Sequence, residues 1–381
     1  MEPRSAPHSS GPPSLVVAYP QRRGASEHEI ASQEAVALRL AALLGCEFLP
    51  RFRPSRHRDL PVPYYVPDRT ITSLARAARL GIRRAADLYG GVTPHAYLAG
   101  KSITHGLVDA RAKAPAGWSR DLAAQLEDVV LRGYSAFTLE DAARAGSRLL
   151  RQGAVRLKPP DANAGRGQQV VRSEQELEAA LKRLAPAQVR RLGLVLEEDL
   201  EDVETYSVGW ARVGRLEISY VGTQSLTRDN KGAQVYGGST LLCARGGFDH
   251  LRALPLSENE RRVLALACRY DTAVSTIYPQ FYASRRNYDV ALGRSADGQA
   301  RCGVLEQSWR LGGASVAELA AMQAFALSPA LASVRAMTCE RYGPDAPEPS
   351  AQQRIYRGQD STVGFITKSG GILEDTHGRA Q

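Results

Sequence analysis

The sequence predicts a fold with α/β or α+β layers that begins with a small β-α-β unit. Three observations lead to this prediction. Short apolar runs with the alternation of β-strands recur along the chain, helix starts marked by capping boxes lie between them, and the connections are short. A chain of 381 residues is also long enough for two or three hydrophobic cores.

The N-terminal domain is predicted from a β-α-β order of elements. An apolar strand spans 15–19, the capping box Ser26-x-x-Glu29 begins a helix, and a second strand follows at 46–49. Further predicted elements are helices at 72–80, 101–107, 139–150, 174–185 and 315–327, a hairpin at 206–222, and a glycine-rich loop lining a site at 223–247. The expected units at the two ends of the chain are a disordered tail at 1–13, the N-terminal α/β domain at 14–94 and a C-terminal tail at 336–381.

Composition narrows the class of protein. Charged residues make up 23% of the chain and hydrophobic residues 43%, as in a globular protein. The net charge of +9 comes from arginines that are scattered over many predicted helices, so we do not expect a nucleic-acid partner. The five cysteines have no C-x-x-C spacing, which argues against a disulfide framework or a zinc site. Because we find no apolar stretch of membrane-spanning length and no signal peptide, we expect no membrane partner and a cytoplasmic location.

A strand ending in lysine is followed by a glycine-bearing turn. The strand is Val155-Arg-Leu-Lys158, and the turn contains Gly165 and Gly167. Glycine lets backbone amides approach a bulky anion, and a lysine on the adjoining strand supplies a positive charge for phosphate. The same pattern also occurs in ordinary hairpins, so phosphate binding and a plain hairpin both remain open at this point.

A second segment runs from an apolar strand into acidic residues. The sequence Leu194-Val-Leu-Glu197-Glu198-Asp-Leu200 is followed by Glu204. Backbone groups at such a strand edge can bind a nucleotide base, and a nearby carboxylate can accept hydrogen bonds from ribose hydroxyls. The alternative is a solvated acidic turn.

The third segment contains two carboxylates on strands that we expect to be neighbours. Asp289 and Glu306 flank a turn with Asp297-Gly298, and together they could bind Mg²⁺, which prefers oxygen ligands and keeps substrate phosphates as partners. Arg310 lies four residues after Glu306, so in a strand both side chains face the same way. The alternative is a surface hairpin with unrelated charges.

The order of these three segments, over roughly residues 95–330, resembles the ATP-grasp superfamily, whose members clamp ATP between two α+β subdomains. Most members are ligases that join a carboxylate to an amine or another nucleophile through an acyl-phosphate. The whole chain, including 87–94 and 101–105, also resembles an uncharacterised bacterial family of ATP-grasp-like proteins. The resemblance implies an α+β fold in which the small N-terminal α/β domain precedes a first ATP-grasp subdomain at 95–195 and a second at 196–335. It also implies ATP and Mg²⁺ as cofactors and a small-molecule carboxylate and nucleophile as substrates.

The resemblance also implies a role for each matching residue. Lys158 would contact the α- and β-phosphates, Gly165 and Gly167 would belong to the loop that closes over them, Glu197, Glu198 and Leu200 to the hinge that holds adenine, and Glu204 would bind ribose. Asp289 and Glu306 would bind magnesium, Arg310 would face the reacting phosphate, Lys101 matches a lysine before the first subdomain, and Lys231 could reach the γ-phosphate.

The sequence departs from the superfamily pattern at one metal-binding position. Members usually have Asn two residues after the bridging glutamate, whereas this chain has Ser308. A serine hydroxyl can also coordinate Mg²⁺, so Ser308 stays a candidate metal ligand. Three alternatives to the ligase remain: an ATP-grasp kinase, a nucleotide-binding module without catalysis, and a basic nucleic-acid binder.

Overall fold

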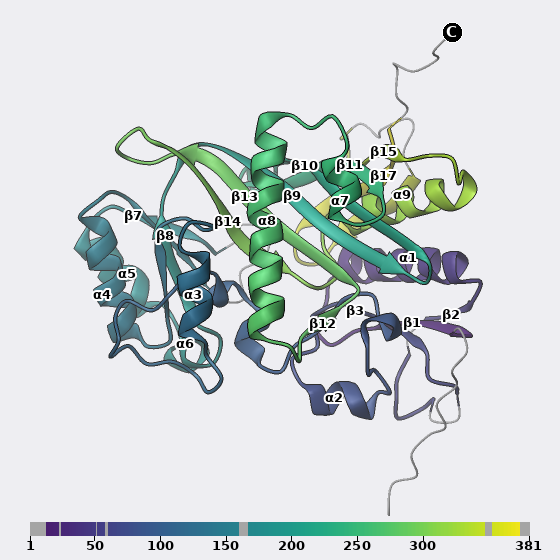
Figure 1. The fold of residues 1–381 in the computed structure, drawn as a ribbon, viewed down its shortest axis with the longest axis horizontal. Helices are drawn as coiled ribbons and strands as arrows, with labels where there is room; N and C mark the ends of the chain where they lie inside the picture. The colour runs from purple at the N-terminus through teal and green to yellow at the C-terminus, as the bar shows by residue number, and fades with distance from the viewer. Residues whose placement is uncertain are drawn as a thin grey trace, which may run out of the picture.

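The computed structural model describes residues 13–22, 24–50, 52–57, 60–159, 167–346 and 353–373, and it contains four β-sheets (Figure 1). The N-terminal sheet is parallel, in the order β2-β1-β3, and consists of β1 (Leu15–Tyr19), β2 (Glu47–Leu49) and β3 (Tyr64–Pro67). Helix α1 (Glu27–Leu44) covers one face, and α2 (Leu74–Arg79) packs with the other. This confirms the predicted N-terminal α/β arrangement. The predicted tail at 1–13 lies outside the described residues except for Pro13.

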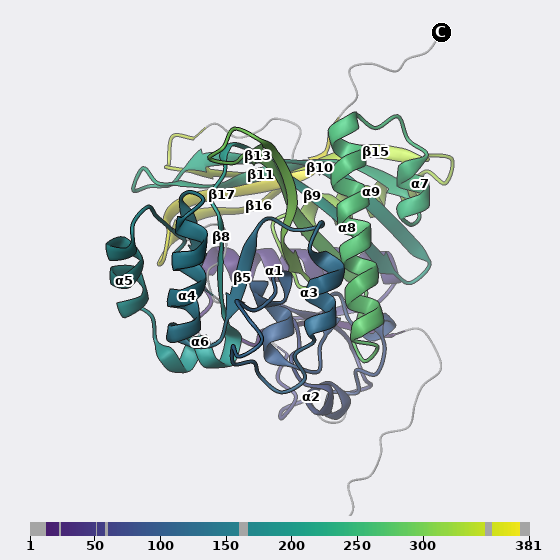
Figure 2. The same ribbon diagram turned by 60° about the vertical axis from the view of Figure 1, so that its left-hand side comes forward.

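The first subdomain contains an antiparallel sheet in the order β5-β8-β6-β7. Its strands are β5 (Gly133–Ala136), β6 (Val155–Lys158), β7 (Gln169–Val171) and β8 (Leu194–Glu198). Alternate residues of these strands pack against α4 (Leu139–Leu150), α5 (Glu174–Lys182) and α6 (Pro186–Leu192). Figure 2 shows α4 and α5 on the outer side of this sheet. The other face of the sheet therefore points toward the rest of the molecule.

The largest sheet has eight strands in the order β14-β13-β9-β10-β11-β15-β17-β16. They are β9 (Glu201–Val213), β10 (Leu216–Arg228), β11 (Gln234–Arg245), β13 (Arg285–Arg294), β14 (Ala300–Ser308), β15 (Ser333–Tyr342), β16 (Gln353–Asp360) and β17 (Gly364–Ile372). Helices α8 (Glu258–Ile277), α7 (Phe248–Arg252) and α3 (Arg120–Leu126) pack on one face. Helix α9 (Ser315–Leu327) lies on the other face, next to α1.

Short elements connect these units. Strand β4 (Gly91–Val92) pairs with β12 (Tyr282–Ala283), so the N-terminal domain is hydrogen-bonded to the start of the segment that becomes β13. Three 3₁₀ helices, Ala85–Asp87, Ala96–Ala99 and Lys101–Thr104, lead into the first subdomain. The predicted helix at 101–107 is therefore shorter than expected. Residues 101–104 are buried between β8 and β14, and they form only a single tight 3₁₀ turn.

Two predictions about irregular segments were wrong. The predicted C-terminal tail contains most of β15 and all of β16 and β17, which extend the eight-stranded sheet. These strands are poor in apolar residues because one face is largely exposed and the other packs on α9 and α1. The glycine-rich stretch 223–247 forms most of β10 and β11 and not a loop. Gly222 and Gly238 allow close strand approach, since an added Cβ would lie 1.9 Å and 2.1 Å from neighbouring carbonyl oxygens.

Other predictions are confirmed. The hairpin turning at Val213-Gly214 joins β9 to β10, and α4 and α9 have the predicted bounds. Within the described residues, no helix is both long and apolar enough to cross a membrane.

Candidate active site

Three buried side chains meet on the inner face of the four-stranded sheet. Lys158 ends β6 and Glu197 lies near the end of β8, and the Lys158 ammonium is ion-paired with Glu197 Oε1. His105 Nε2 lies 3.1 Å from Glu197 Oε2. All three side chains are at most 3% exposed. Burial by itself raises the pKa of Glu197, but the Lys158 charge and the His105 imidazole outweigh it and hold the pKa below its usual value.

A glycine in β5 makes room for this cluster. Gly133 pairs with Glu197 in the sheet, and a Cβ on Gly133 would lie 2.9 Å from His105 Cε1 and 2.7 Å from the Leu196 carbonyl oxygen. Any side chain here would push the imidazole away from the carboxylate. His105 is not among the predicted site residues, because a single histidine in a sequence is more often structural.

The two predicted metal carboxylates face each other across neighbouring strands. Asp289 in β13 is the register partner of Glu306 in β14, which confirms that the two residues lie on neighbouring strands. Lys101 Nζ lies 2.7 Å from Glu306 Oε2 and is itself buried. One ammonium beside two carboxylates leaves one net negative charge, which suits the binding of a divalent cation.

Asp289 is held by two side-chain amides. Gln224 in β10 and Asn287 in β13 donate to Asp289 Oδ1 at 2.8 Å and 3.0 Å. Both bonds use the same oxygen, which leaves Oδ2 as the atom of this carboxylate that can coordinate a cation. Burial and the neighbouring Glu306 raise the pKa of Asp289 to about 6, against the opposing effect of Asn287, Lys101 and Gln224.

A fully buried network of hydrogen bonds and one ion pair holds Asn287, which donates to Asp289. The Tyr220 hydroxyl oxygen lies 2.8 Å from Asn287 Oδ1 and 2.6 Å from Glu318 Oε1, so its single hydrogen can be donated to either acceptor. Glu318, on α9, forms a bidentate ion pair with Arg285 at 2.8 Å and 2.7 Å. Tyr220 reaches across β9 because its strand partner is Gly209, where a Cβ would lie 2.2 Å from the tyrosine oxygen.

A five-residue segment joins the two clusters. Lys101 at its start contacts Glu306, and His105 at its end contacts Glu197. A 3₁₀ helix rises about 2.0 Å per residue, so the two ends are roughly 8 Å apart. Gln307 fixes this segment, since its amide donates to the carbonyls of Leu98 and Gly100 at 2.8 Å and 2.6 Å. The segment therefore connects the lysine–glutamate pair of the first subdomain to the acidic pair of the second.

The remaining hinge residues have different surroundings. Glu198 accepts from the Arg132 backbone N–H at 3.0 Å and is ion-paired with the Arg132 side chain. Leu200 is buried beside Ala291. Glu204 accepts a hydrogen bond from Tyr206 at 2.7 Å and is otherwise exposed.

The other predicted residues are spread more widely. Gly165 lies outside the described residues, whereas Gly167 has a φ of 74°. Ser308 is the register partner of Asn287, at the end of β14. Arg310 follows β14 and donates to the Leu311 carbonyl at 2.7 Å.

Lys231 lies apart from these groups. It occupies the exposed turn between β10 and β11, where its backbone N–H donates to Asp229 Oδ1 at 2.8 Å. The side-chain amide of the neighbouring Asn230 donates to the carbonyls of Val363 and Phe365, at the start of β17. Within the described part of the chain, the Lys231 side chain forms no ion pair with Asp289 or Glu306. Its role as a γ-phosphate ligand stays a prediction.

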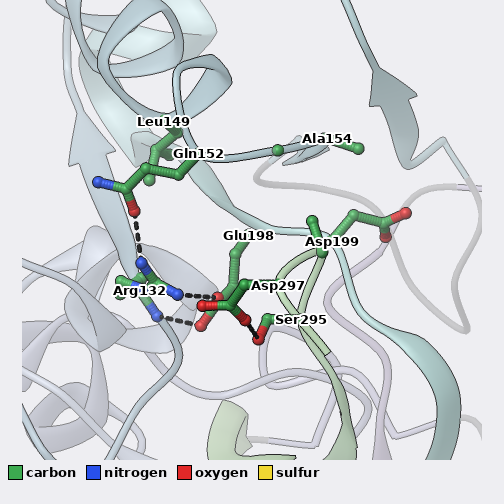
Figure 3. A pocket seen from close by; sticks show the side chains of 10 residues that line it. Arg132, Leu149, Gln152, Ala154, Glu198, Asp199, Ser295 and Asp297 are labelled. Atoms are coloured by element: carbon green, nitrogen blue, oxygen red, sulfur yellow. Dashed lines mark hydrogen bonds and ion pairs between the residues drawn. The ribbon is translucent and has the colours of Figure 1, made fainter. Parts of the chain in front are cut away.

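A pocket of about 270 Å³ lies behind the hinge, on the side of Glu198. Figure 3 shows Arg132 between Gln152 and Glu198, with Asp297 and Ser295 close to Glu198. Of the predicted nucleotide-binding residues, only Glu198 lines this pocket. The two buried clusters thus lie on another side of the hinge.

The residues present fit a magnesium ion for which water and the substrate supply most of the ligands. Within the described residues, no group of three or more His, Cys, Asp or Glu side chains could hold a metal ion. Asp289 and Glu306 offer two carboxylates, and Mg²⁺ is commonly bound by one or two carboxylates together with substrate phosphates. Ser308 lies on the same strand edge as a third oxygen.

Comparison with known structures identifies the fold. The chain is similar to N5-carboxyaminoimidazole synthetase from Staphylococcus aureus complexed with ADP, with a TM-score of 0.56, 9% identity, and coverage of 95% of this chain and 94% of that one. It is also similar to the biotin carboxylase domain of Hydrogenobacter thermophilus 2-oxoglutarate carboxylase in complex with MgADP, ADP and bicarbonate, with a TM-score of 0.54, 15% identity and coverage of 95% and 87%.

A third similar structure is phosphoribosylamine–glycine ligase from Thermotoga maritima, with a TM-score of 0.51, 16% identity and coverage of 94% of this chain and 90% of that one. At such identities the likeness concerns the fold, which is the ATP-grasp fold that the sequence predicted. A search of curated proteins gave no match. A family model matches residues 16–370, and the chain therefore belongs to the family described as Protein of unknown function (DUF3182).

Proposed function

We propose that this protein is an ATP- and Mg²⁺-dependent ligase that joins a carboxylate to an amine or a similar nucleophile through an acyl-phosphate. The observation that carries the proposal is the segment Lys101–His105, which ties the Lys158–Glu197 pair to the Asp289–Glu306 pair. A triphosphate is long enough to contact both. The ATP-grasp fold supports the proposal, because structures with this fold were determined with ADP and MgADP bound.

Each side chain has a role that its surroundings favour. Lys158 would neutralise phosphate charge, with Glu197 and His105 holding its ammonium in place. Asp289 and Glu306 would hold Mg²⁺, which when bound would neutralise charge on the β- and γ-phosphates. Lys101, which is ion-paired to Glu306 at 2.7 Å, would turn to a phosphate oxygen once the cation takes its place.

The reaction then needs little covalent chemistry from the protein. A carboxylate oxygen of the substrate attacks the γ-phosphorus, the bond to the β–γ bridging oxygen breaks, and ADP leaves. The nucleophile attacks the acyl carbon and phosphate leaves. Arg310, four residues after Glu306, would stabilise the oxyanions that form. Positioning and charge neutralisation supply most of the rate.

A thermal-shift screen with MgATP and candidate acids and amines tests this proposal. A ligand that binds only the folded state raises the midpoint. Phosphorus NMR then identifies the products: a ligase releases ADP and free phosphate only when both substrates are present, whereas a kinase transfers phosphate to a hydroxyl. Binding of MgATP without ADP formation across the panel would instead support a nucleotide-binding module. Failure of MgATP to shift the midpoint would contradict the proposal.

Glu306→Gln tests the metal assignment. Loss of a charge that acts mainly in the transition state costs on the order of 3 kcal/mol, so turnover should fall about 100-fold while ATP binding falls much less. Glu340→Gln is a matched control, since Glu340 is also a partly buried strand carboxylate, paired to Lys368 at 2.9 Å. Turnover in Glu306→Gln equal to that of the control would refute the assignment.

A further inference from the structure

Glu318 joins three parts of the molecule. It lies on α9 and is completely buried, and its carboxylate contacts residues of three other segments. Oε1 lies 2.6 Å from the Tyr220 hydroxyl oxygen in β10 and 2.7 Å from Arg285 NH2 in β13, and Oε2 accepts from Arg285 Nε at 2.8 Å. Oε2 also accepts from the hydroxyl of Tyr89 in the N-terminal domain, where the Tyr89 backbone N–H donates to the Tyr65 carbonyl at 2.7 Å. The carboxylate therefore ties the N-terminal domain and α9 to the eight-stranded sheet.

Arg285 connects Glu318 to the end of β14 and the segment that follows it. Its Nε and NH2 donate to Glu318, whereas NH1 donates to the carbonyl oxygen of Ser308 at 3.2 Å and to that of Arg310. Burial by itself lowers the pKa of Arg285, but the charge of Glu318 outweighs burial and raises the pKa above its usual value. The guanidinium therefore stays charged, and it fixes the backbone at Ser308, the candidate metal ligand.

Tyr220 connects Glu318 to Asp289 through a single side chain, that of Asn287. The hydroxyl oxygen of Tyr220 lies 2.8 Å from Asn287 Oδ1. Because Oδ1 of this amide faces the hydroxyl, its NH2 group faces Asp289, to whose Oδ1 it donates at 3.0 Å. Without the hydroxyl, the Asn287 amide could turn over and place its carbonyl oxygen, which cannot donate, against the carboxylate. The Tyr220 hydroxyl therefore sets which end of the amide meets Asp289.

Tyr288 offers a comparison within the same sheet. It precedes Asp289 in β13, so its side chain points to the opposite face of the strand, where its hydroxyl donates to Asp271 on α8. Tyr220 and Tyr288 are both completely buried, and the hydroxyl of each lies beside a carboxylate. Removal of either hydroxyl thus costs the fold a similar contact, whereas only the Tyr220 hydroxyl lies on the Asp289 face.

We propose that Tyr220 and Glu318 are positioning residues of the magnesium site, which hold the Asn287 amide in the orientation that leaves Asp289 Oδ2 for the cation. This inference rests on the proposed function, which assigns magnesium to Asp289 and Glu306. A buried ion pair is often no more stabilising than a well-packed apolar core, so stability alone does not account for this network. Residues that orient a metal ligand contribute about 10- to 100-fold to metal affinity.

Nucleotide binding to the full-length protein tests this role. Isothermal titration with ADP, once in EDTA and once with saturating Mn²⁺, separates binding of the nucleotide from binding of the metal. In Tyr220→Phe we expect the Kd of MnADP to rise about tenfold, because Asp289 is no longer held for the cation, and the Kd of ADP in EDTA to stay at the value of the parent protein. Tyr288→Phe is the matched control, in which neither Kd should change.

Glu318→Asp is a second variant, and it decides the question if Tyr220→Phe does not fold. It keeps a negative charge for Arg285 but is shorter by one methylene, so its carboxylate withdraws from Tyr220, and it should weaken binding of MnADP but not of metal-free ADP. Equal MnADP binding in Tyr220→Phe and Tyr288→Phe, or a rise of both Kd values by the same factor in Tyr220→Phe, would overturn the positioning role. A parent protein whose ADP affinity does not respond to Mn²⁺ would instead overturn the metal assignment in the proposed function.

Discussion

Replacing Glu197 by Gln should strongly destabilise the protein. Glu197 is the buried counter-ion of Lys158 and lies 3.1 Å from His105, in a site where side-chain exposure is at most 3%. The glutamine can still accept hydrogen bonds but carries no charge, so the Lys158 ammonium would remain buried without compensation. Removing one partner of a buried ion pair costs about 3–5 kcal/mol, and we expect the lower end because the hydrogen bonds can persist.

The assay is urea unfolding at pH 7 followed by circular dichroism. Glu178→Gln is the matched control, because Glu178 pairs with Lys182 at 2.6 Å but both side chains are about two-thirds exposed or more. Its unfolding midpoint should not change, since exposed ion pairs contribute little. If Glu197→Gln lost less than about 1 kcal/mol, the Lys158 ammonium would not depend on this carboxylate, and the reasoning about the cluster would be wrong.

Three further changes follow from the same geometry. The folded-state pKa of Asp289, about 6 against an ordinary 3.8, means that stability present below about pH 4 is lost as the pH rises toward 6. The loss is about 3 kcal/mol and should vanish in Asp289→Asn, as urea unfolding at pH 4.5 and 7 would show; an unchanged slope contradicts the burial of this carboxylate. Gly133→Ala should cost about 2 kcal/mol, because its Cβ would lie 2.9 Å from His105 Cε1, whereas Gly100→Ala, with its nearest atom at 3.7 Å, should be nearly neutral; equal effects would count against the close packing. Gln307→Leu leaves two carbonyls without their donors, so amide exchange at Lys101 should accelerate, and unaltered exchange would show that Gln307 does not fix this segment.

The sequence predicted helices and strands best where local signals agreed. Thr138 accepts from the Asp141 N–H at the start of α4, and this cap coincided with the predicted boundary. A short turn between two alternating strands predicted that Asp289 and Glu306 lie on neighbouring strands, whereas their exact register depends on a bulge between Asp289 and Val290 that the sequence did not reveal. By contrast, polar residues and glycines outnumber apolar residues in β16 and β17, so their sequences look like a tail. Only the pairing of β17 with β15 and of β16 with β17 makes them strands.

The candidate site was predictable where its residues are neighbours in sequence or strand register. Asn287 shares a face of β13 with Asp289 and could have been found by alternation alone. Gln224 could not, because it reaches Asp289 across β9 from a strand 65 residues away. The inward position of Glu197 likewise depends on which face of β8 meets His105, and that is fixed only by the packing of α4 and α5 on the other face.

The most direct test of the shared nucleotide site is a crystal structure with Mn²⁺ and a non-hydrolysable ATP analogue. We expect an anomalous manganese peak between Asp289 and Glu306, and triphosphate oxygens within hydrogen-bonding distance of Lys158. Manganese bound elsewhere, or a nucleotide that leaves Lys158 paired only with Glu197, would show that the two clusters do not serve one site.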